Sequence, residues 1–392
     1  MSHGDDFDAI TIEQLRASGS VKWSMFPGRI GAFVAEMDFG AAPTITQALH
    51  SAVDNGLFGY LPPAVSDAMS AAAAAWQKNS YGWDVPADRV HPIADVIKGL
   101  EVAIEHYTTP GSAIILPTPA YMPFLTVPPS MGREIIEVPL AVNEGRYEVD
   151  LDALEMAFQA GGEMLILCNP YNPVGRVFTR AELVAISEVV ARNGGRVFSD
   201  EIHAPLVYAP NRHVPYASVS DTAAGHTVTA TSASKAWNLP GLKCAQFIIS
   251  NDADAEVWER IGPMASHGAS NLGVIANTAA YTSGSQWLEH VVEYLDDNRR
   301  RLGELLAEHI PGIRYTPPEG TYIAWLDCRE LGLGDHPADF FAEHAGVALT
   351  DGVACGASGA GFVRFIFATP RPIIEQAVRQ MAAALERAPR KS

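Results

Sequence analysis

The chain has 392 residues, a net charge of -18 at neutral pH, and a composition that is 48% hydrophobic and 18% charged. That length exceeds what one ordinary hydrophobic core accommodates, so we expect two or three domains. The acidic balance argues against a nucleic-acid partner, because phosphate binding depends on clustered Lys and Arg, and apolar runs such as residues 113–116 and 164–168 are too short to cross a membrane.

The chain start and the cysteines both indicate a cytoplasmic protein. Residues 1–8 are polar and acidic, without the apolar segment of a secretory signal. The cysteines are scattered, and their spacing is not that of a zinc site or a disulfide framework: Cys168, Cys244, Cys328 and Cys355. We therefore expect free thiols in a reducing compartment and no metal centre.

Three segments are expected in chain order. Residues 1–45 form an N-terminal arm that also joins a small domain, residues 46–285 form a large domain, and residues 286–392 supply a linker helix and the rest of the small domain. Within the large domain, residues 57–63 predict a stiff turn with exposed aromatic side chains. Taken alone, Tyr60 in that turn fits a packing aromatic better than a functional one.

The middle of the chain alternates short apolar runs with polar or proline-bearing loops. The runs are expected strands: residues 113–116, 164–168, 196–198 and 227–231. Helical stretches such as residues 180–191 lie between some of them. This alternation predicts a largely parallel α/β sheet, in which ligands bind beyond the carboxyl ends of the strands.

Lys235 lies in a polar loop of small residues between two of the expected strands. A primary amine in a desolvated pocket loses its proton more easily and can then form a Schiff base with a carbonyl. We interpret Lys235 as the residue that carries pyridoxal phosphate (PLP). A solvent-exposed loop lysine fits this stretch, taken alone, equally well.

The PLP ring needs a carboxylate at its nitrogen and hydrogen-bond donors at its oxygen. Asp200, at the end of the run 196–198, is the candidate carboxylate, although it also fits a helix N-cap, and Glu201 competes with it. Asn172 and His203 are candidate donors to the ring oxygen. Each also fits a structural role, Asn172 as a turn former before a proline and His203 as a satisfied structural histidine.

The PLP phosphate needs backbone N–H groups at a helix start, hydroxyls and a cation. Val96 and Ile97 begin an expected helix and supply the amides. Ser232 and Ser234 supply hydroxyls, and Lys243 supplies charge. Ordinary loop polarity and a solvated lysine explain these residues as well when each is taken alone.

Two further side chains complete the expected site. Tyr121 can stack on the ring face, and Arg364 can hold a substrate carboxylate with its planar fork. Arg364 lies in the alternating run 363–367 and, taken alone, fits a surface ion pair on an edge strand better. Most of these candidates share one predicted sheet edge, and that convergence favours a PLP site over a set of separate structural roles.

With these residues in place, the chain resembles the fold type I PLP enzymes, the class I/II aminotransferase superfamily, over about residues 22–384. The blocks that carry the resemblance are residues 168–176 (CNPYNPVGR) and 232–235 (SASK). Within the superfamily the chain is similar to the cystathionine β-lyase (C–S lyase) branch of MalY/PatB type, at residues 37–39, 58–60, 121–124, 199–203 and 369–371. His203 supports the branch, because aminotransferases usually place a tyrosine three residues after the aspartate.

The resemblance implies a large domain with a mostly parallel seven-stranded sheet flanked by helices, and a smaller α+β domain. It implies a homodimer with active sites at the subunit interface, where Tyr60 would reach the cofactor phosphate of the other copy. The implied reaction is α,β-elimination from L-cystathionine or another cysteine S-conjugate to a thiol, pyruvate and ammonia, a step tied to methionine biosynthesis.

Three positions depart from the family pattern. Residues 95–97 replace the usual glycine start of the phosphate turn, Tyr171 stands where the branch usually has histidine, and Lys243 stands where aminotransferases usually carry an arginine. We expect the cofactor site to tolerate these departures, which bear instead on the choice of substrate.

Other functions remain open at this point. An aminotransferase shares every step up to the carbanion, and a PLP-binding regulator without turnover would share the site. Ser232 and Lys235 also match the Ser-x-x-Lys motif of serine acylases formally, but the Ser-Asp-Asn and Lys-Thr-Gly partners of that motif are absent from the sequence.

Overall fold

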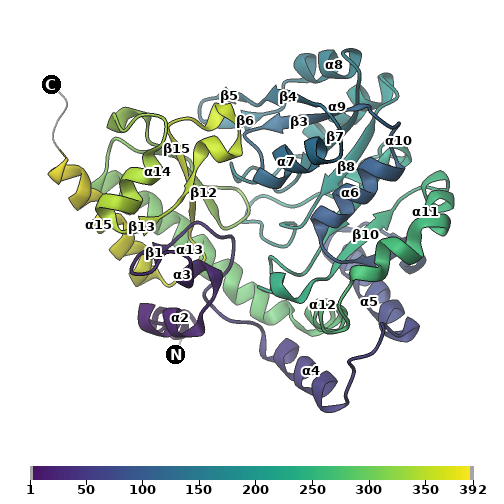
Figure 1. The fold of residues 1–392 in the computed structure, drawn as a ribbon, viewed down its shortest axis with the longest axis horizontal. Coiled ribbons are helices and arrows are strands. Elements are labelled where there is room, and N and C mark those ends of the chain that lie inside the picture. Colours follow the sequence, from purple (N-terminus) through teal and green to yellow (C-terminus); the bar gives the residue numbers. More distant parts are fainter. Residues whose placement is uncertain (1–2, 389–392) are drawn as a thin grey trace.

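A seven-stranded sheet forms the centre of the larger domain in the computed structural model, which describes residues 3–388 (Figure 1). Its strands, in spatial order, are β2 (Val90–Ile93), β10 (Ala245–Ile249), β9 (Thr227–Thr231), β8 (Arg196–Asp200), β7 (Gly162–Cys168), β3 (Ala113–Thr118) and β4 (Ile135–Pro139). The five strands from β9 to β4 are parallel, and β10 is antiparallel to both of its neighbours. The predicted, mostly parallel α/β sheet is confirmed.

The interior strands of the large sheet are largely buried because helices cover the sheet. Every residue of β9 and β10 is buried, as expected for strands that are covered on both faces. The helices of this domain are α4 (Pro43–Asp54), α5 (Pro63–Trp76), α6 (Val96–His106), α7 (Met122–Ser130), α8 (Leu151–Gln159), α9 (Arg180–Arg192), α10 (Asp221–Gly225), α11 (Asp252–Ala265) and α12 (Asn271–Ser283).

Helix α6 approaches the sheet closely, which matters because its N-terminus faces the functional site. It packs against β2, β8, β9 and β10. Gly99 makes this approach possible: a Cβ there would lie 2.9 Å from Ile93 Cδ1 and 3.4 Å from Ala230 Cβ. A larger residue at position 99 would require Ile93 or the helix to shift.

The smaller domain is built on a four-stranded antiparallel sheet. The strands, in spatial order, are β11 (Arg314–Tyr315), β12 (Ile323–Asp327), β15 (Phe362–Ile366) and β14 (Thr350–Asp351). The long helix α13 (Ser285–His309) packs against the C-terminal helix α15 (Arg371–Arg387) beside this sheet. None of the helices within residues 3–388 combines the length and the apolar content needed to cross a bilayer.

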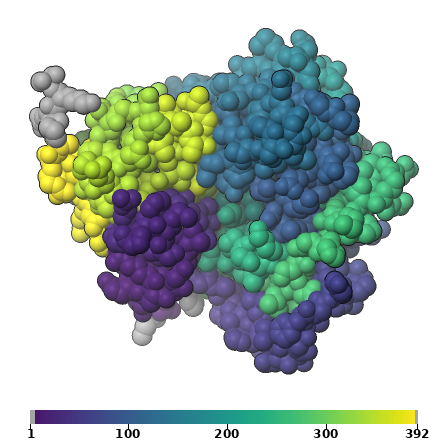
Figure 2. Space-filling view, in the orientation of Figure 1, coloured from purple at the N-terminus to yellow at the C-terminus, as the bar shows by residue number. Residues whose placement is uncertain are grey.

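The N-terminal arm lies against the C-terminal part of the chain. It contains α1 (His3–Asp8), α2 (Ile12–Ser18), α3 (Val21–Ser24) and β1 (Ile30–Gly31), and β1 pairs in parallel with β13 (Val347–Ala348). Figure 2 shows the purple arm packed on the yellow-green C-terminal region. The arm, α13 and the C-terminal segment share one apolar core, while the core under the large sheet is a separate cluster.

A buried ion pair fastens the arm to the small domain. Lys22, which is 1% exposed, donates to Asp38 Oδ2 at 2.8 Å and to the carbonyls of Glu36 and Ala368, both at 3.2 Å. Trp23 Nε1 donates to the other Asp38 oxygen at 2.8 Å. Because all of these donors are used, the chain that follows β1 is held in one position against the small domain.

Candidate active site

A cavity of about 660 Å³ opens at the carboxyl ends of the parallel strands, between the large sheet, the small domain and the arm. This is where ligands bind in open α/β sheets. Ten of the twelve predicted site residues line it: Val96, Ile97, Tyr121, Asn172, Asp200, His203, Ser234, Lys235, Lys243 and Arg364. Segments that are up to 268 residues apart in the chain, from Val96 to Arg364, therefore meet in one space.

Lys235 lies in the loop between β9 and β10, as expected, and its amine points into the cavity region. Its Nζ donates to the carbonyl of Ala35 at 3.0 Å. Burial, with a further contribution from the positive charge of Arg364, lowers the pKa of Lys235 to about 8. About one tenth of this amine is therefore neutral at pH 7, and the neutral form is the one that a nucleophile or a general base requires.

Asp200 ends strand β8 and is buried. Burial raises the pKa of Asp200 to about 7, the charge of Glu201 adds to the rise, and the Ile202 N–H and Lys235 oppose it. The Ile202 N–H donates to Asp200 Oδ1 at 3.0 Å. A buried carboxylate with this raised proton affinity is suited to accept a hydrogen bond from a protonated group, such as the ring nitrogen of a pyridinium.

Arg364 lies on β15, an interior strand of the small sheet, and is only 2% exposed. Its Nη1 donates to Asn172 Oδ1 at 3.3 Å, and its Nη2 donates to the Phe33 carbonyl at 3.0 Å and to Thr350 Oγ1 at 3.2 Å. The surface ion pair on an edge strand, which the local sequence favoured, is wrong. A buried guanidinium without a carboxylate partner among these contacts is suited to an anionic ligand.

Two buried polar atoms of the cavity residues have no hydrogen-bond partner within the described part of the chain: Arg364 Nε and His203 Nδ1. Unpaired buried polar atoms are costly, so a ligand is the simplest explanation for both. Burial and the charges of Lys235 and Arg364 lower the pKa of His203 to about 3, so its ring is neutral. These two atoms, with Asn172, fit the ring oxygen and the substrate carboxylate expected of a PLP enzyme.

The expected phosphate end of the cavity lies at the N-terminus of α6, where Val96 and Ile97 begin the helix. Asp95 caps this helix through Oδ1, which accepts from the Lys98 N–H at 2.8 Å. Asp95 Oδ2 accepts from Lys243 Nζ at 2.8 Å. Two of the departures from the family pattern, at Asp95 and Lys243, are therefore partners, and this pair supplies a positioned ammonium beside the helix start.

Ser232 and Tyr171 are not among the residues that line the cavity. Ser232 Oγ donates to the Cys244 carbonyl at 2.7 Å and accepts from the Ser234 N–H at 3.0 Å, so it shapes the lysine loop from behind. Tyr171 is buried, and its hydroxyl donates to the Pro117 carbonyl at 2.7 Å. Tyr171 supports the strand ends, whereas Ser234 faces the cavity.

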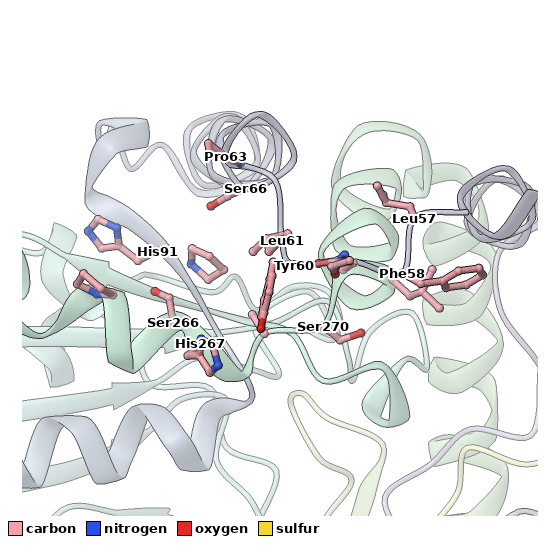
Figure 3. Close-up of a pocket in the computed structure, with 16 residues that line it drawn as sticks. Leu57, Phe58, Tyr60, Leu61, Pro63, Ser66, His91, Ser266, His267 and Ser270 are labelled. Atoms are coloured by element: carbon pink, nitrogen blue, oxygen red, sulfur yellow. Dashed lines mark hydrogen bonds between the residues drawn. The ribbon is translucent and has the colours of Figure 1, made fainter. Parts of the chain in front are cut away.

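Tyr60 lies in a different hollow, which is shown in Figure 3 and has a volume of about 730 Å³. The side chain is 91% exposed, and the centroid of its ring lies 6.4 Å from that of the His267 ring. Phe58 beside it is 70% exposed. Within one chain, Tyr60 is therefore not part of the Lys235 cavity.

Sequence reasoning missed the apolar wall that the arm contributes. Phe26 and Phe33 line the cavity and contact each other edge to face, with ring centroids 4.9 Å apart. Met122 and Leu349 also line it. No local signal distinguishes Phe26 or Phe33 from ordinary arm residues, because the arm reaches the cavity only after β1 pairs with β13.

Comparisons with known proteins agree with this geometry. The family model of aminotransferase class I and II matches residues 34–381. A cystathionine β-lyase from Corynebacterium glutamicum is 38% identical over 95% of this chain and 99% of its own. A Corynebacterium diphtheriae structure, described as a candidate PLP-dependent β-cystathionase, is 41% identical, covers 97% of this chain and 99% of its own, and superposes with a TM-score of 0.92. PLP-containing cystalysin from Treponema denticola is 28% identical over 96% and 97% of the two chains, with a TM-score of 0.89.

Proposed function

From the premise that the chain belongs to the aminotransferase class I and II family, we propose that it is a PLP-dependent C–S lyase. Its substrate is L-cystathionine or another cysteine S-conjugate, and its products are a thiol, pyruvate and ammonia. The observation that carries the proposal is one cavity that brings together a lysine of lowered pKa, a buried aspartate and a buried arginine with an unpaired Nε. The names of the relatives supply the reaction class.

PLP, when bound, supplies an electrophilic aldehyde and a cationic ring that withdraws electrons from the substrate α-carbon. Lys235 would hold the aldehyde, Asp200 the ring nitrogen, and Asn172 and His203 the ring oxygen. The phosphate would take the amides of Val96 and Ile97, the hydroxyl of Ser234 and the charge of Lys243. Tyr121, half-buried at the N-cap of α7, offers the ring a flat face.

The residues of the chain perform three tasks in the reaction. Arg364 binds the α-carboxylate of the substrate and fixes the direction in which its Cα–H bond points. Lys235 Nζ, whose pKa is lowered to about 8, removes the proton from Cα and holds it. The arm, through Phe26 and Phe33, covers the cavity and reduces access of water to the reacting bonds.

The decisive test is product analysis with purified, PLP-saturated protein and L-cystathionine or S-methyl-L-cysteine. Stoichiometric thiol, pyruvate and ammonia support the lyase. Transfer of the amino group to a 2-oxo acid, with little pyruvate, would identify an aminotransferase instead. The Lys235→Ala variant is the matched control, because it retains the cavity walls and loses both the cofactor linkage and the base.

We further propose that the enzyme is a homodimer with shared active sites, which accounts for the exposed Tyr60 and Phe58. An exposed aromatic pair suits contact with a second copy, and Tyr60 would then reach that copy's phosphate site. Mixing Lys235→Ala and Tyr60→Phe subunits tests this, because a mixed dimer contains one site without either substitution. Recovery of activity on mixing supports shared sites, and a monomer in sedimentation analysis rejects them.

We also propose a cellular location and a metabolic role for this enzyme. Cys168, Cys244, Cys328 and Cys355 are free and buried, which suits the reducing cytoplasm that we propose as its location. With L-cystathionine as substrate, the released thiol is homocysteine, and the enzyme would serve methionine biosynthesis. Loss of growth without methionine in a strain that depends on this enzyme would support that role.

A further inference from the structure

A second buried carboxylate lies directly behind Asp200, and the proposed reaction does not use it. Glu201 is fully buried. Its Oε1 accepts from Ser199 Oγ and from the Tyr216 N–H, both at 2.9 Å, and its Oε2 lies 2.9 Å from His213 Nε2. Alternate positions along a strand share a face, so the contact with Ser199 places Glu201 on the face of β8 opposite Asp200.

Besides Glu201, the ring of His213 contacts Tyr81. It is 6% exposed and packs edge to face on Tyr81, which ends the π-helix η1 (Gln77–Tyr81), with ring centroids 4.9 Å apart. Its Nδ1 has no hydrogen-bond partner within residues 3–388. With Nε2–H donating to Glu201, the ring therefore directs its one hydrogen bond in the described structure to that carboxylate.

The backbone keeps the two carboxylates at a fixed separation. The Asn169 N–H donates to the Asp200 carbonyl at 2.9 Å, the Glu201 N–H donates to the Ala230 carbonyl at 2.8 Å, and Thr231 Oγ1 donates to the Glu201 carbonyl at 3.1 Å. Neighbouring strands thus hold this strand end from both sides. A fixed negative charge in such a poorly solvated place acts strongly on its neighbour.

We propose that the Glu201–His213 pair is a positioning device for Asp200, which holds a negative charge behind it and so strengthens its hold on the protonated ring nitrogen of the cofactor. The inference rests on the proposed function, in which Asp200 faces that nitrogen. Asp200 remains the contacting group, and Glu201 and His213 act through it. The charge of Glu201 is one cause of the raised pKa of Asp200, after burial, which agrees with this role.

The test is a pH titration of the visible absorbance of Lys235-bound PLP, without substrate. Glu201→Gln keeps an oxygen that can accept from Ser199 and Tyr216 but removes the charge, so protonated forms of the site lose stabilisation. We expect the titration midpoint to fall by about one pH unit. His213→Ala removes the group that holds Glu201 Oε2 and leaves the carboxylate less firmly placed behind Asp200, so the midpoint should fall by a smaller amount. His213→Gln supplies an amide donor and should restore the wild-type value.

Asp254→Asn is the matched control. Asp254 is also buried, at 3% exposure, and pairs with Arg196 at 2.7 Å, at the start of the same strand β8. Arg196 lies four residues before Asp200, or about 13 Å along a strand. The variant loses a buried carboxylate of the same kind, and its midpoint should stay within about 0.2 pH units of wild type, since the lost charge is distant from the ring.

The outcomes separate this inference from the proposed function. A folded, PLP-loaded Glu201→Gln protein with the wild-type midpoint overturns the inference alone. An equal shift in Asp254→Asn also overturns it, because the effect would then follow from losing any buried carboxylate. Wild-type protein that binds no PLP overturns the proposed function and the inference together. If Glu201→Gln does not fold, a His213→Ala midpoint equal to wild type overturns the inference on its own.

Discussion

Replacing Lys22 by methionine should destabilise the protein strongly, although Lys22 lies outside the cavity. Methionine is unbranched and replaces the apolar stem of lysine, but it removes an ammonium with three acceptors. Asp38, whose side chain is 3% exposed in the ion pair, would keep only the Trp23 donor for its negative charge. The variant therefore leaves an unpaired charge in a buried position.

The expected cost follows from that geometry. Removing one partner of a buried ion pair typically costs about 3 to 5 kcal/mol, because the remaining charge stays desolvated. For 392 residues, an unfolding entropy of about 2.1 cal/mol/K per residue converts this cost into a fall in Tm of about 4 to 6 °C. The arm also presents Phe33 and Ala35 to the cavity, so we expect the KM for a cysteine S-conjugate to rise several-fold.

Differential scanning calorimetry at saturating PLP and fixed protein concentration measures the change. Lys78→Met is the control: Lys78 pairs with Asp84, but the two side chains are 59% and 75% exposed, so its Tm should change by less than about 1 °C. The double variant Lys22→Met with Asp38→Leu removes both charges and should recover part of the lost stability. Equal Tm values for Lys22→Met and wild type would refute the reasoning.

Three further predictions concern the cavity. Arg364→Lys should raise the substrate KM about 10- to 100-fold with an unchanged PLP spectrum, because an ammonium cannot form the forked contact; an unaltered KM would contradict the carboxylate role. Lys235→Ala should abolish the visible PLP absorbance and lower activity about a thousandfold, and retained absorbance would exclude Lys235 as the attachment point. In cofactor-free protein the raised pKa of Asp200, about 7, means that the folded state binds more protons than the unfolded state between about pH 4 and pH 7. Asp200 therefore stabilises the fold below about pH 4 and loses this contribution as pH rises through 7, so the Tm of Asp200→Asn should gain on wild type from pH 4.5 to 7.5 in thermal-shift measurements, and a constant difference would reject the raised pKa.

Much of the site could be predicted because short segments of sequence indicate both where a strand ends and which polar residues follow it. Asp200 and Lys235 each follow an apolar run, and parallel strands bring such positions to the same sheet edge. Hydrophobic periodicity therefore predicts that both residues lie at one sheet edge, without any knowledge of which strands are neighbours.

The environment of Arg364 could not be predicted in the same way. Alternation along residues 363–367 indicates which face the side chain occupies, but it does not say whether the strand is interior or at an edge. β15 is interior because β12 and β14 pair on either side of it, and these partners come from distant parts of the chain. The burial of Arg364, and with it the case for a bound carboxylate, depends on that pairing.

By itself, the sequence determined the α/β class, the lysine loop and the polar side chains at the strand ends, because these depend on the period of apolar residues and on neighbouring residue types. Only the tertiary structure decided that the arm lines the cavity with Phe26 and Phe33, and that Tyr60 lies outside it. It also decided that Glu201 faces His213 rather than the cofactor site. These outcomes depend on contacts between segments far apart in the chain, and such contacts leave no local pattern.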